Sequence, residues 1–328
     1  MSAAVLPPAG PASIKLELSS ACQLRCPSCP TATGETARTL GAGFVRAAAF
    51  RQLLDANPGV REIEISNYGE PFLNPELGQI LADADARGVV LRCDNGSNLN
   101  NARDDVLEAL VRHRLRTLRC SIDGASAETY AVYRVGGDFA RVLANIRTIN
   151  AHKRRYASPF PELTWQFIAF GHNQHEIEAA RAQATALDMK FFVKLNWDER
   201  FSPPIDEAML KRAGRLEDAS RTAHRARTGA DYMDPLCHQL WDSPQINWDG
   251  RVLGCCRNFW GEFGGNAFRD GLSTVLDGER MRHARAMLQG RAPARADVPC
   301  STCEIYLDRR RHGRWVERDE AGVDTSAR

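Results

Sequence analysis

The chain has 328 residues, with 43 Lys and Arg against 41 Asp and Glu, and a formal net charge of +2. Because this balance gives no broad basic field, we expect no nucleic-acid partner. No segment approaches the roughly 20 apolar residues of a membrane span, and residues 1–13 lack the basic and apolar regions of a signal peptide. We therefore expect a cytoplasmic protein without membrane attachment.

Short strand-like runs alternate with helical segments along the first two thirds of the chain. The predicted strands are residues 14–19, 61–67, 89–94, 117–123, 163–170 and 190–196. The predicted helices are residues 44–56, 75–87, 104–112, 139–155 and 175–187. Repeated strand–helix units predict a parallel sheet with functional residues at its carboxyl edge. The predicted fold class is α/β, a partial (β/α)6 TIM-type barrel followed by a small loop-rich iron-sulfur module.

Composition predicts how the chain is divided. A flexible amino terminus at 1–13 precedes the barrel at 14–200, and a charged linker follows at 201–230. The small module occupies 231–311, where five of the ten cysteines lie, and a mobile tail covers 312–328. So short a module has little hydrophobic core, which makes it a candidate for stabilisation by metal.

Directly after the first predicted strand, Cys22, Cys26 and Cys29 form a Cys-x3-Cys-x2-Cys motif. Thiols stay reduced in the cytoplasm, so grouped cysteines indicate metal or redox chemistry rather than disulfides. A structural zinc ion needs four closed ligands, and no fourth cysteine or histidine is near. A cuboidal iron-sulfur cluster with one open iron fits better, with zinc or a chance grouping as the alternatives.

In this position the motif resembles that of the radical S-adenosylmethionine (SAM) superfamily. The resemblance implies that the three cysteines hold a 4Fe-4S cluster whose open iron binds the amino and carboxylate groups of SAM. One electron from the cluster then cleaves SAM to a 5'-deoxyadenosyl radical. It also implies a reductant such as flavodoxin or ferredoxin as a partner.

Loops after the later strands resemble the SAM-binding loops of that family. Residues 67–71 are similar to its Gly-Gly-Glu-Pro loop, which would meet the methionine ammonium group. Arg134 is a candidate partner for the SAM carboxylate, or a surface ion-pair residue. Residues 171–173 resemble the loop near the adenine. The implied SAM-binding residues are Tyr68, Gly69, Glu70, Pro71, Asn95, Ser121, Asp123 and Arg134. Cys93 and Cys120, in apolar strands, are predicted to pack in the core.

The second group of cysteines resembles a shortened form of the auxiliary-cluster domain called SPASM. The resemblance implies one auxiliary 4Fe-4S cluster on Cys237, Cys255, Cys300 and Cys303, and zinc on the same four thiolates is the alternative. Residues 246–252, with Asp-Gly at the turn, predict a hairpin that delivers Cys255.

Cys256 is left over, either as a packing residue or as a thiol that donates a hydrogen atom to a substrate radical. The predicted function is hydrogen abstraction from a carbon of a polar substrate, leading to dehydrogenation or epimerisation. Because only 13 residues precede the first strand, a sugar- or aminocyclitol-like molecule is favoured over a peptide that needs a leader-binding domain. A peptide or protein maturase and a non-catalytic electron-transfer protein are the alternatives. The candidate substrate contacts are Lys194, Asn196, Trp197, Asp198, Trp241 and Asn258.

Overall fold

The computed structural model describes residues 11–318. One mixed sheet runs through it in the order β6-β5-β4-β3-β2-β1-β7-β8, and β1 to β6 are parallel. The strands are β1 (Ser13–Leu16), β2 (Glu62–Glu64), β3 (Val90–Ser97), β4 (Thr117–Ser121), β5 (Glu162–Ala169), β6 (Lys190–Leu195), β7 (Gln245–Ile246) and β8 (Val252–Gly254). The six predicted barrel strands are therefore confirmed, each with at least one shifted end.

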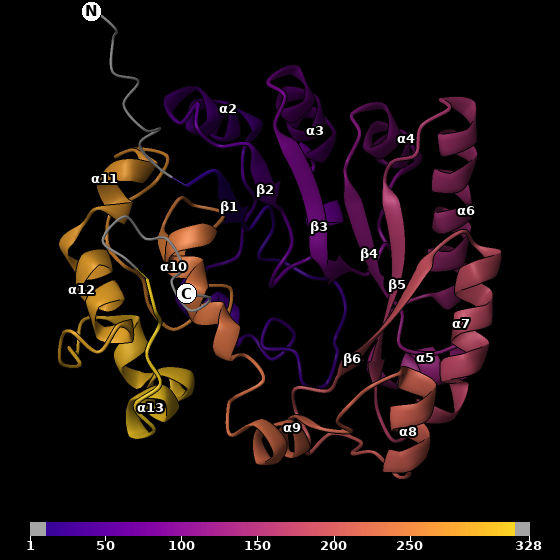
Figure 1. Cartoon of the computed structure of the whole chain (residues 1–328). Helices are drawn as coiled ribbons and strands as arrows, with labels where there is room; N and C mark the ends of the chain where they lie inside the picture. The colour runs from indigo at the N-terminus through magenta and orange to yellow at the C-terminus, as the bar shows by residue number, and fades with distance from the viewer. Residues whose placement is uncertain (1–10, 319–328) are drawn as a thin grey trace, which may run out of the picture.

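Helices connect consecutive barrel strands and cover one side of the sheet (Figure 1). They are α2 (Ala47–Ala56), α3 (Leu77–Ala86), α4 (Asp104–Arg112), α5 (Ala127–Tyr133), α6 (Phe139–Arg155) and α7 (Ile177–Ala186). Ser126 caps α5 by accepting a hydrogen bond from the Thr129 amide at 3.2 Å. Since β6 and β8 are the two edges, the sheet stays open, and the predicted partial barrel is confirmed. One helix that the sequence analysis did not predict, α1 (Glu35–Leu40), follows the cysteine motif.

The cysteine-rich module extends the barrel sheet. Its β7 pairs in parallel with β1, with Leu16 opposite Ile246, and β8 returns antiparallel to β7. The predicted hairpin is confirmed: the Asn247 amide donates to the Arg251 carbonyl at 2.8 Å. Gly250 has a φ of 89° at this turn, a conformation that favours glycine. The hairpin therefore places the segment after β8 beside the barrel.

The rest of the second half is more helical than the expected loop-rich module. The linker contains α8 (Glu207–Gly214) and α9 (Arg221–Thr228), and the module contains η3 (Asp234–His238), α10 (Gln239–Asp242), α11 (Leu272–Leu276), α12 (Glu279–Leu288), η4 (Pro299–Thr302) and α13 (Glu304–Arg311). Buried side chains such as Leu272, Met281 and Met287 join the same hydrophobic cluster as the barrel. The module is thus stabilised by the burial of apolar side chains, which its many turns and cysteines did not predict.

Part of the predicted mobile tail is packed. Val316 is buried, and its amide donates to the Leu288 carbonyl at 2.9 Å. The guanidinium of Arg318 pairs with Asp242. Residues 312–318 therefore lie against the module, whereas 319–328 and the first ten residues of the predicted flexible amino terminus lie outside the described residues.

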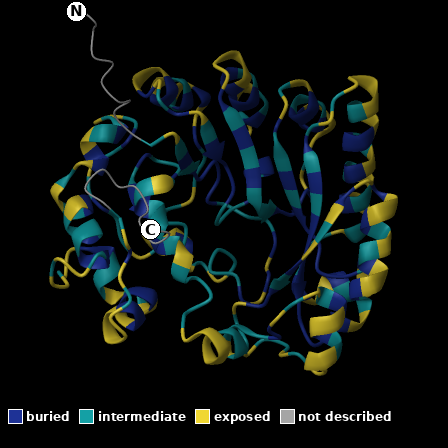
Figure 2. Cartoon of the chain, in the orientation of Figure 1, coloured by how far each residue is buried: buried dark blue, intermediate teal, exposed yellow. Residues whose placement is uncertain are grey.

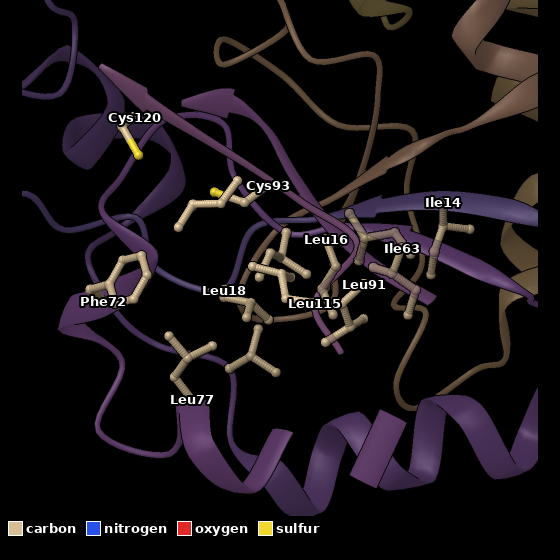
Figure 3. Close-up of a cluster of buried hydrophobic side chains, with 14 of the residues drawn as sticks. Ile14, Leu16, Leu18, Ile63, Phe72, Leu77, Leu91, Cys93, Leu115 and Cys120 are labelled. Carbon is tan, nitrogen blue, oxygen red and sulfur yellow. The ribbon is translucent and has the colours of Figure 1, made fainter. Parts of the chain in front are cut away.

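The core lies between the sheet and its helices. In Figure 2 the buried colour follows the strands and the sheet-facing sides of the helices. Cys93 and Cys120 lie within this core, among side chains such as Leu91 and Leu115 (Figure 3), and both are buried. Their environment is the one predicted for packing residues. No helix within residues 11–318 is long and apolar enough to cross a membrane.

Candidate active site

The three cysteines of the first motif lie on the loop after β1 and line one cavity of about 300 Å3. Cys26 is buried, and Cys22 and Cys29 are partly buried. The Cys29 amide donates to the Cys26 carbonyl at 3.1 Å, and the Arg25 amide donates to the Val135 carbonyl at 2.9 Å. A short, internally bonded loop therefore presents three sulfur atoms to one space.

An apolar wall stands behind this loop, formed by Leu24, Tyr133, Ile168, Phe170 and Phe201. Burial raises the pKa of the Cys22 thiol to about 12. Burial also raises the pKa of Cys26, although the nearby Arg134 guanidinium opposes the shift. Thiolates in such a site need a cation for compensation, which metal binding provides.

A lone metal ion and a cuboidal cluster require different spacings of their cysteine ligands. Within residues 11–318, no three His, Cys, Asp or Glu side chains gather closely enough to hold one metal ion. A tetrahedral zinc with Zn–S bonds of about 2.3 Å needs its sulfurs within roughly 4 Å of one another. A cuboidal cluster binds each cysteine through a different iron, so its ligands are spread more widely.

The loop after β2 is docked against the cysteine loop. A Cβ atom added to Gly69 would lie 2.0 Å from the Ser19 carbonyl oxygen and 2.7 Å from that of Ala21, so only glycine fits. The Glu70 amide donates to the Ala21 carbonyl at 2.8 Å. Tyr68 and Gly69 line the cavity. The predicted SAM loop therefore lies against the predicted cluster loop.

Two buried carboxylates hold this loop in place. Glu17, directly after β1, accepts hydrogen bonds from the amides of Tyr68 (2.9 Å) and Gly69 (3.1 Å). Burial raises the Glu17 pKa to about 8. Glu70 accepts from the Ser97 hydroxyl at 2.7 Å and the Asn98 amide at 2.6 Å. Glu70 therefore joins the loops after β2 and at the end of β3, and it also lines the cavity.

The other predicted SAM residues differ in position. Asn95, Ser121 and Arg134 line the cavity, whereas Pro71 and Asp123 do not. Asp123 is fully buried and accepts from Arg134 Nε at 2.6 Å and from the Ile168 amide at 2.7 Å. The interpretation of Arg134 as a surface ion-pair residue is wrong, because its side chain is only 12% exposed and that of Asp123 is 0% exposed. Asp123 positions Arg134, whose Nη1 lies 3.8 Å from Cys26 Sγ.

The second group of cysteines surrounds a smaller, separate space. Cys237, Cys255, Cys300 and Cys303 line one cavity of about 20 Å3 together with apolar side chains such as Leu240 and Ile305. Burial raises the Cys237 pKa to about 12. The Tyr68 hydroxyl is buried without a hydrogen-bond partner. Burial raises the pKa of Tyr68, and Cys255 and Cys256 add to the shift, whereas the Asn67 side chain opposes it. An acceptor such as a cluster sulfide would satisfy that hydroxyl, so these residues fit an auxiliary cluster.

Adjacent cysteines have different surroundings. Cys255 lines the small cavity, whereas Cys256 lines the large cavity that the first three cysteines share. The Cys256 amide donates to Gln239 Oε1 at 2.8 Å, and Gln239 Nε2 lies 3.5 Å from Cys256 Sγ. The structure therefore brings Cys256 to the predicted SAM site rather than to the other four cysteines.

Only Lys194 and Trp197, of the six candidate substrate contacts, line the large cavity. The Asn196 amide instead closes a turn by donating to the carbonyls of Asp198 and Phe201. Asp198 pairs with Arg200.

The two candidate substrate contacts from the auxiliary module, Trp241 and Asn258, contact other residues of that module instead of lining the large cavity. Asn258 donates to the carbonyls of Leu253 and Gly261, so its amide closes a loop. Trp241 contacts the guanidinium groups of Arg285 and Arg318. His172, in the predicted adenine loop, bonds to the Ser202 hydroxyl at 2.8 Å and does not line the large cavity.

Sequence reasoning missed several residues of this site. Glu17 gave no signal of its own, because it occupies a polar position of the alternating segment 14–18, as a solvent-facing residue would. Arg221, the first residue of α9, and Arg257, which directly follows Cys256, both line the large cavity. In an arginine-rich chain they carried no local signal.

The comparisons with known families agree with this geometry. The model of the radical SAM superfamily matches residues 16–182, which is half of the chain. The chain belongs to the radical SAM superfamily. A second model, the iron-sulfur cluster-binding domain SPASM, matches residues 237–304 and includes the four cysteines of the small cavity. Radical SAM and SPASM domains bind a 4Fe-4S cluster with SAM and an auxiliary iron-sulfur cluster, and these are the cofactors of this chain.

Individual radical SAM relatives are distant. An AdoMet-dependent heme synthase from Methanosarcina barkeri (strain Fusaro / DSM 804) is 30% identical over 142 residues, which cover 42% of this chain and 39% of that protein. Streptococcus suis SuiB bound to S-adenosylmethionine has a TM-score of 0.65 at 15% identity, covering 91% of this chain and 72% of SuiB. SuiB bound to its precursor peptide SuiA gives 0.63 at 14% identity, covering 91% and 70%. At such identities the likeness of the structures establishes a shared fold.

Proposed function

We propose that this radical SAM chain abstracts a hydrogen atom from a carbon of a small polar substrate, leading to epimerisation or dehydrogenation. One observation carries the proposal: Cys256 lines the large cavity with Cys22, Cys26 and Cys29, while Cys255 lines the small one. The cavity that would hold SAM thus contains a thiol that the predicted auxiliary ligands leave free. Epimerisation is the outcome that this arrangement supports best.

Different residues of the chain would bind the two clusters and SAM. Cys22, Cys26 and Cys29 would hold the first cluster, and Cys237, Cys255, Cys300 and Cys303 the second. When bound, the clusters and SAM supply a one-electron donor, a 5'-deoxyadenosyl radical and an electron acceptor. Tyr68, Gly69 and Glu70 would bind the amino end of SAM, with Asn95, Ser121 and Arg134 along the rest of the cofactor. The apolar wall around Tyr133 and Phe170 limits the access of water.

For epimerisation, Cys256 is the hydrogen donor. After a substrate C–H bond is broken, the carbon radical takes a hydrogen atom from the Cys256 thiol on the opposite face. The S–H bond breaks, a C–H bond forms, and a thiyl radical remains. One electron from a flavodoxin- or ferredoxin-type reductant and one proton from water restore the thiol. We place these reactions in the cytoplasm, where the ten cysteines stay reduced.

For dehydrogenation, the same carbon radical loses one electron and one proton, and a double bond to carbon or oxygen forms. Cys256 then gives up no hydrogen atom. The two outcomes therefore differ in whether a hydrogen from exchangeable solvent reaches the product.

Anaerobic reaction in deuterated water separates them. The cluster-loaded protein, SAM and dithionite are incubated with sugars and aminocyclitols, and 5'-deoxyadenosine and product masses are measured. Epimerisation predicts one deuterium at the inverted carbon, since the Cys256 thiol exchanges with solvent. Dehydrogenation predicts a product two hydrogens lighter and without deuterium.

Two variants refine this result. Cys256→Ala is expected to abolish deuterium incorporation, whereas Cys120→Ala, a cavity-forming change in the core, should retain it. Absence of 5'-deoxyadenosine under every condition would refute the proposed function. Deuterium incorporation that survives in Cys256→Ala would remove the donor role of Cys256.

A further inference from the structure

The basic side chains that line the large cavity outnumber the acidic ones. Four are basic, Arg134, Lys194, Arg221 and Arg257, and one is acidic, Glu70. Arg134 is neutralised by its buried ion pair with Asp123. The Glu70 carboxylate accepts hydrogen bonds from the Ser97 hydroxyl and the Asn98 amide. Three cations therefore face the cavity without a matching carboxylate among its lining residues.

Lys194, near the end of β6, is partly buried at this cavity. Within residues 11–318 its ammonium group makes no hydrogen bond and no ion pair. Burial lowers the pKa of Lys194 to about 8. Arg221 contributes to that shift, and Cys256 opposes it. A partly desolvated ammonium group without a partner raises the free energy of the empty site.

Arg221 and Arg257 each have a buried guanidinium nitrogen without a hydrogen-bond partner. Arg221, at the start of α9, lies over the Tyr232 ring at 5.0 Å, and its Nε is buried without a hydrogen-bond partner. Burial lowers the pKa of Arg221 and Arg257 contributes to the shift, whereas Tyr232, Asp231 and Glu199 oppose it. Glu199, Asp231 and Glu304 line a second hollow together with the two arginines, outside the large cavity. The Nε of Arg257 is also buried without a partner, although another of its nitrogens lies 3.4 Å from the exposed Glu304. Both guanidinium groups thus retain donors that nothing in the described chain uses.

We propose that Lys194, Arg221 and Arg257 bind an anionic group of the substrate, a phosphoryl or a carboxylate group. Two planar guanidinium forks and an ammonium group match the oxygens of such an anion, and an anion would relieve the repulsion among the three cations. Arg257 lines the same cavity as Cys256, so a substrate held by Arg257 lies in the space that the thiol also lines. This inference rests on the proposed function and names the substrate class: an anionic polar molecule rather than a neutral sugar.

Direct binding to the cluster-loaded protein with SAM tests this. Inorganic phosphate and malonate are titrated by anaerobic calorimetry at constant ionic strength, with chloride as the background anion. We expect one of the two to bind, and the tighter one identifies the phosphoryl or the carboxylate source. Arg221→Gln and Lys194→Met should each weaken that binding at least tenfold. Arg200→Gln, whose guanidinium is 92% exposed and pairs with Asp198, is the matched control and should change it less than twofold.

Each result decides the proposal. Lys194→Arg should retain most of the binding, which separates loss of charge from loss of folding. Failure of both anions to bind, or equal weakening by Arg200→Gln, would refute the anion site. A variant that weakens SAM binding and spares anion binding would assign the cations to the carboxylate of SAM and overturn the proposal. Because binding is measured without turnover, a wild type that binds the anion but forms no 5'-deoxyadenosine would contradict only the proposed function.

Discussion

The side-chain amide of Asn67 donates a hydrogen bond to the carbonyl oxygen of Cys256 at 3.0 Å. Asn67 stands at the start of the predicted SAM loop after β2, and Cys256 follows the hairpin of the SPASM module. The bond therefore joins the two iron-sulfur domains within the large cavity. A second contact between the module and the barrel domain is the hydrogen bond from the Trp248 indole to the Leu40 carbonyl at 3.1 Å. The module thus forms one wall of the site.

The bond from Asn67 should hold Cys256 in place for hydrogen transfer. Asn67→Ala is expected to lower the free energy of unfolding by about 0.5–1.5 kcal/mol and to reduce deuterium incorporation. The matched control is Asn145→Ala, which removes an amide bond to the Leu99 carbonyl elsewhere in the barrel. A similar loss of stability with full deuterium incorporation is expected there. Equal incorporation in both variants would show that Asn67 does not position Cys256.

Iron content distinguishes the cysteine groups. Two 4Fe-4S clusters predict about eight irons per chain, and the Cys22/Cys26/Cys29→Ala triple variant should retain about four. Cys255→Ala should lose up to about four irons, whereas Cys256→Ala should keep all of them. The control is Cys93→Ala, since Cys93 is buried in the core. If Cys256→Ala loses iron and Cys255→Ala does not, then Cys256 rather than Cys255 is the ligand of the auxiliary cluster. One equivalent of bound zinc would contradict the auxiliary cluster.

Gly69 leaves no room for a side chain between the two loops. Gly69→Ala would push its Cβ against the Ser19 and Ala21 carbonyls, so we expect a loss of about 1–3 kcal/mol and at least tenfold weaker SAM binding. Gly78, within α3, has no heavy atom within 4 Å of a built Cβ. Gly78→Ala should therefore stabilise the protein by about 0.4–1 kcal/mol. Calorimetric titration with SAM and thermal unfolding measure both effects, and unimpaired SAM binding in Gly69→Ala would show that the loop can move.

Glu17 should make stability depend on pH. Burial raises its pKa from the ordinary 4.5 to about 8, the amides of Tyr68 and Gly69 oppose the shift, and Glu64 adds to it. Between these values the folded chain keeps a proton that the unfolded chain has lost. Unfolding then releases a proton, so the free energy of unfolding falls as the pH rises.

Glu17→Gln removes this titration, and its single side-chain oxygen can accept from only one of the two amides, which adds a loss of stability that does not depend on pH. Its stability relative to wild type should grow by about 1.4 kcal/mol per pH unit between pH 5 and 8. Urea unfolding of the loaded protein at three pH values measures the difference. A constant difference across that range would mean that Glu17 is ionised in the folded state.

Local sequence patterns were enough to predict the features that depend on nearby residues. The alternation of strands and helices follows from hydrophobic periodicity, and α4 and α6 were predicted with their exact bounds. The tight spacing of Cys22, Cys26 and Cys29 specified a shared inorganic centre, because closely spaced thiols on one loop can reach the same cluster. The cap of α5 is also a local feature, because the Ser126 hydroxyl accepts from the amide three residues later.

Which distant side chains share a cavity could be seen only once the strands and helices were packed together. The pairing of β7 with β1 and the turn after β8 separate Cys255 from Cys256, although sequence neighbours look equivalent. Lys194, Arg221 and Arg257 come from a strand, a helix and a loop, and no local pattern marks them. Periodicity reports which way a side chain points within its own element. Sheet order and register set what it meets, and these depend on burial summed over the whole chain.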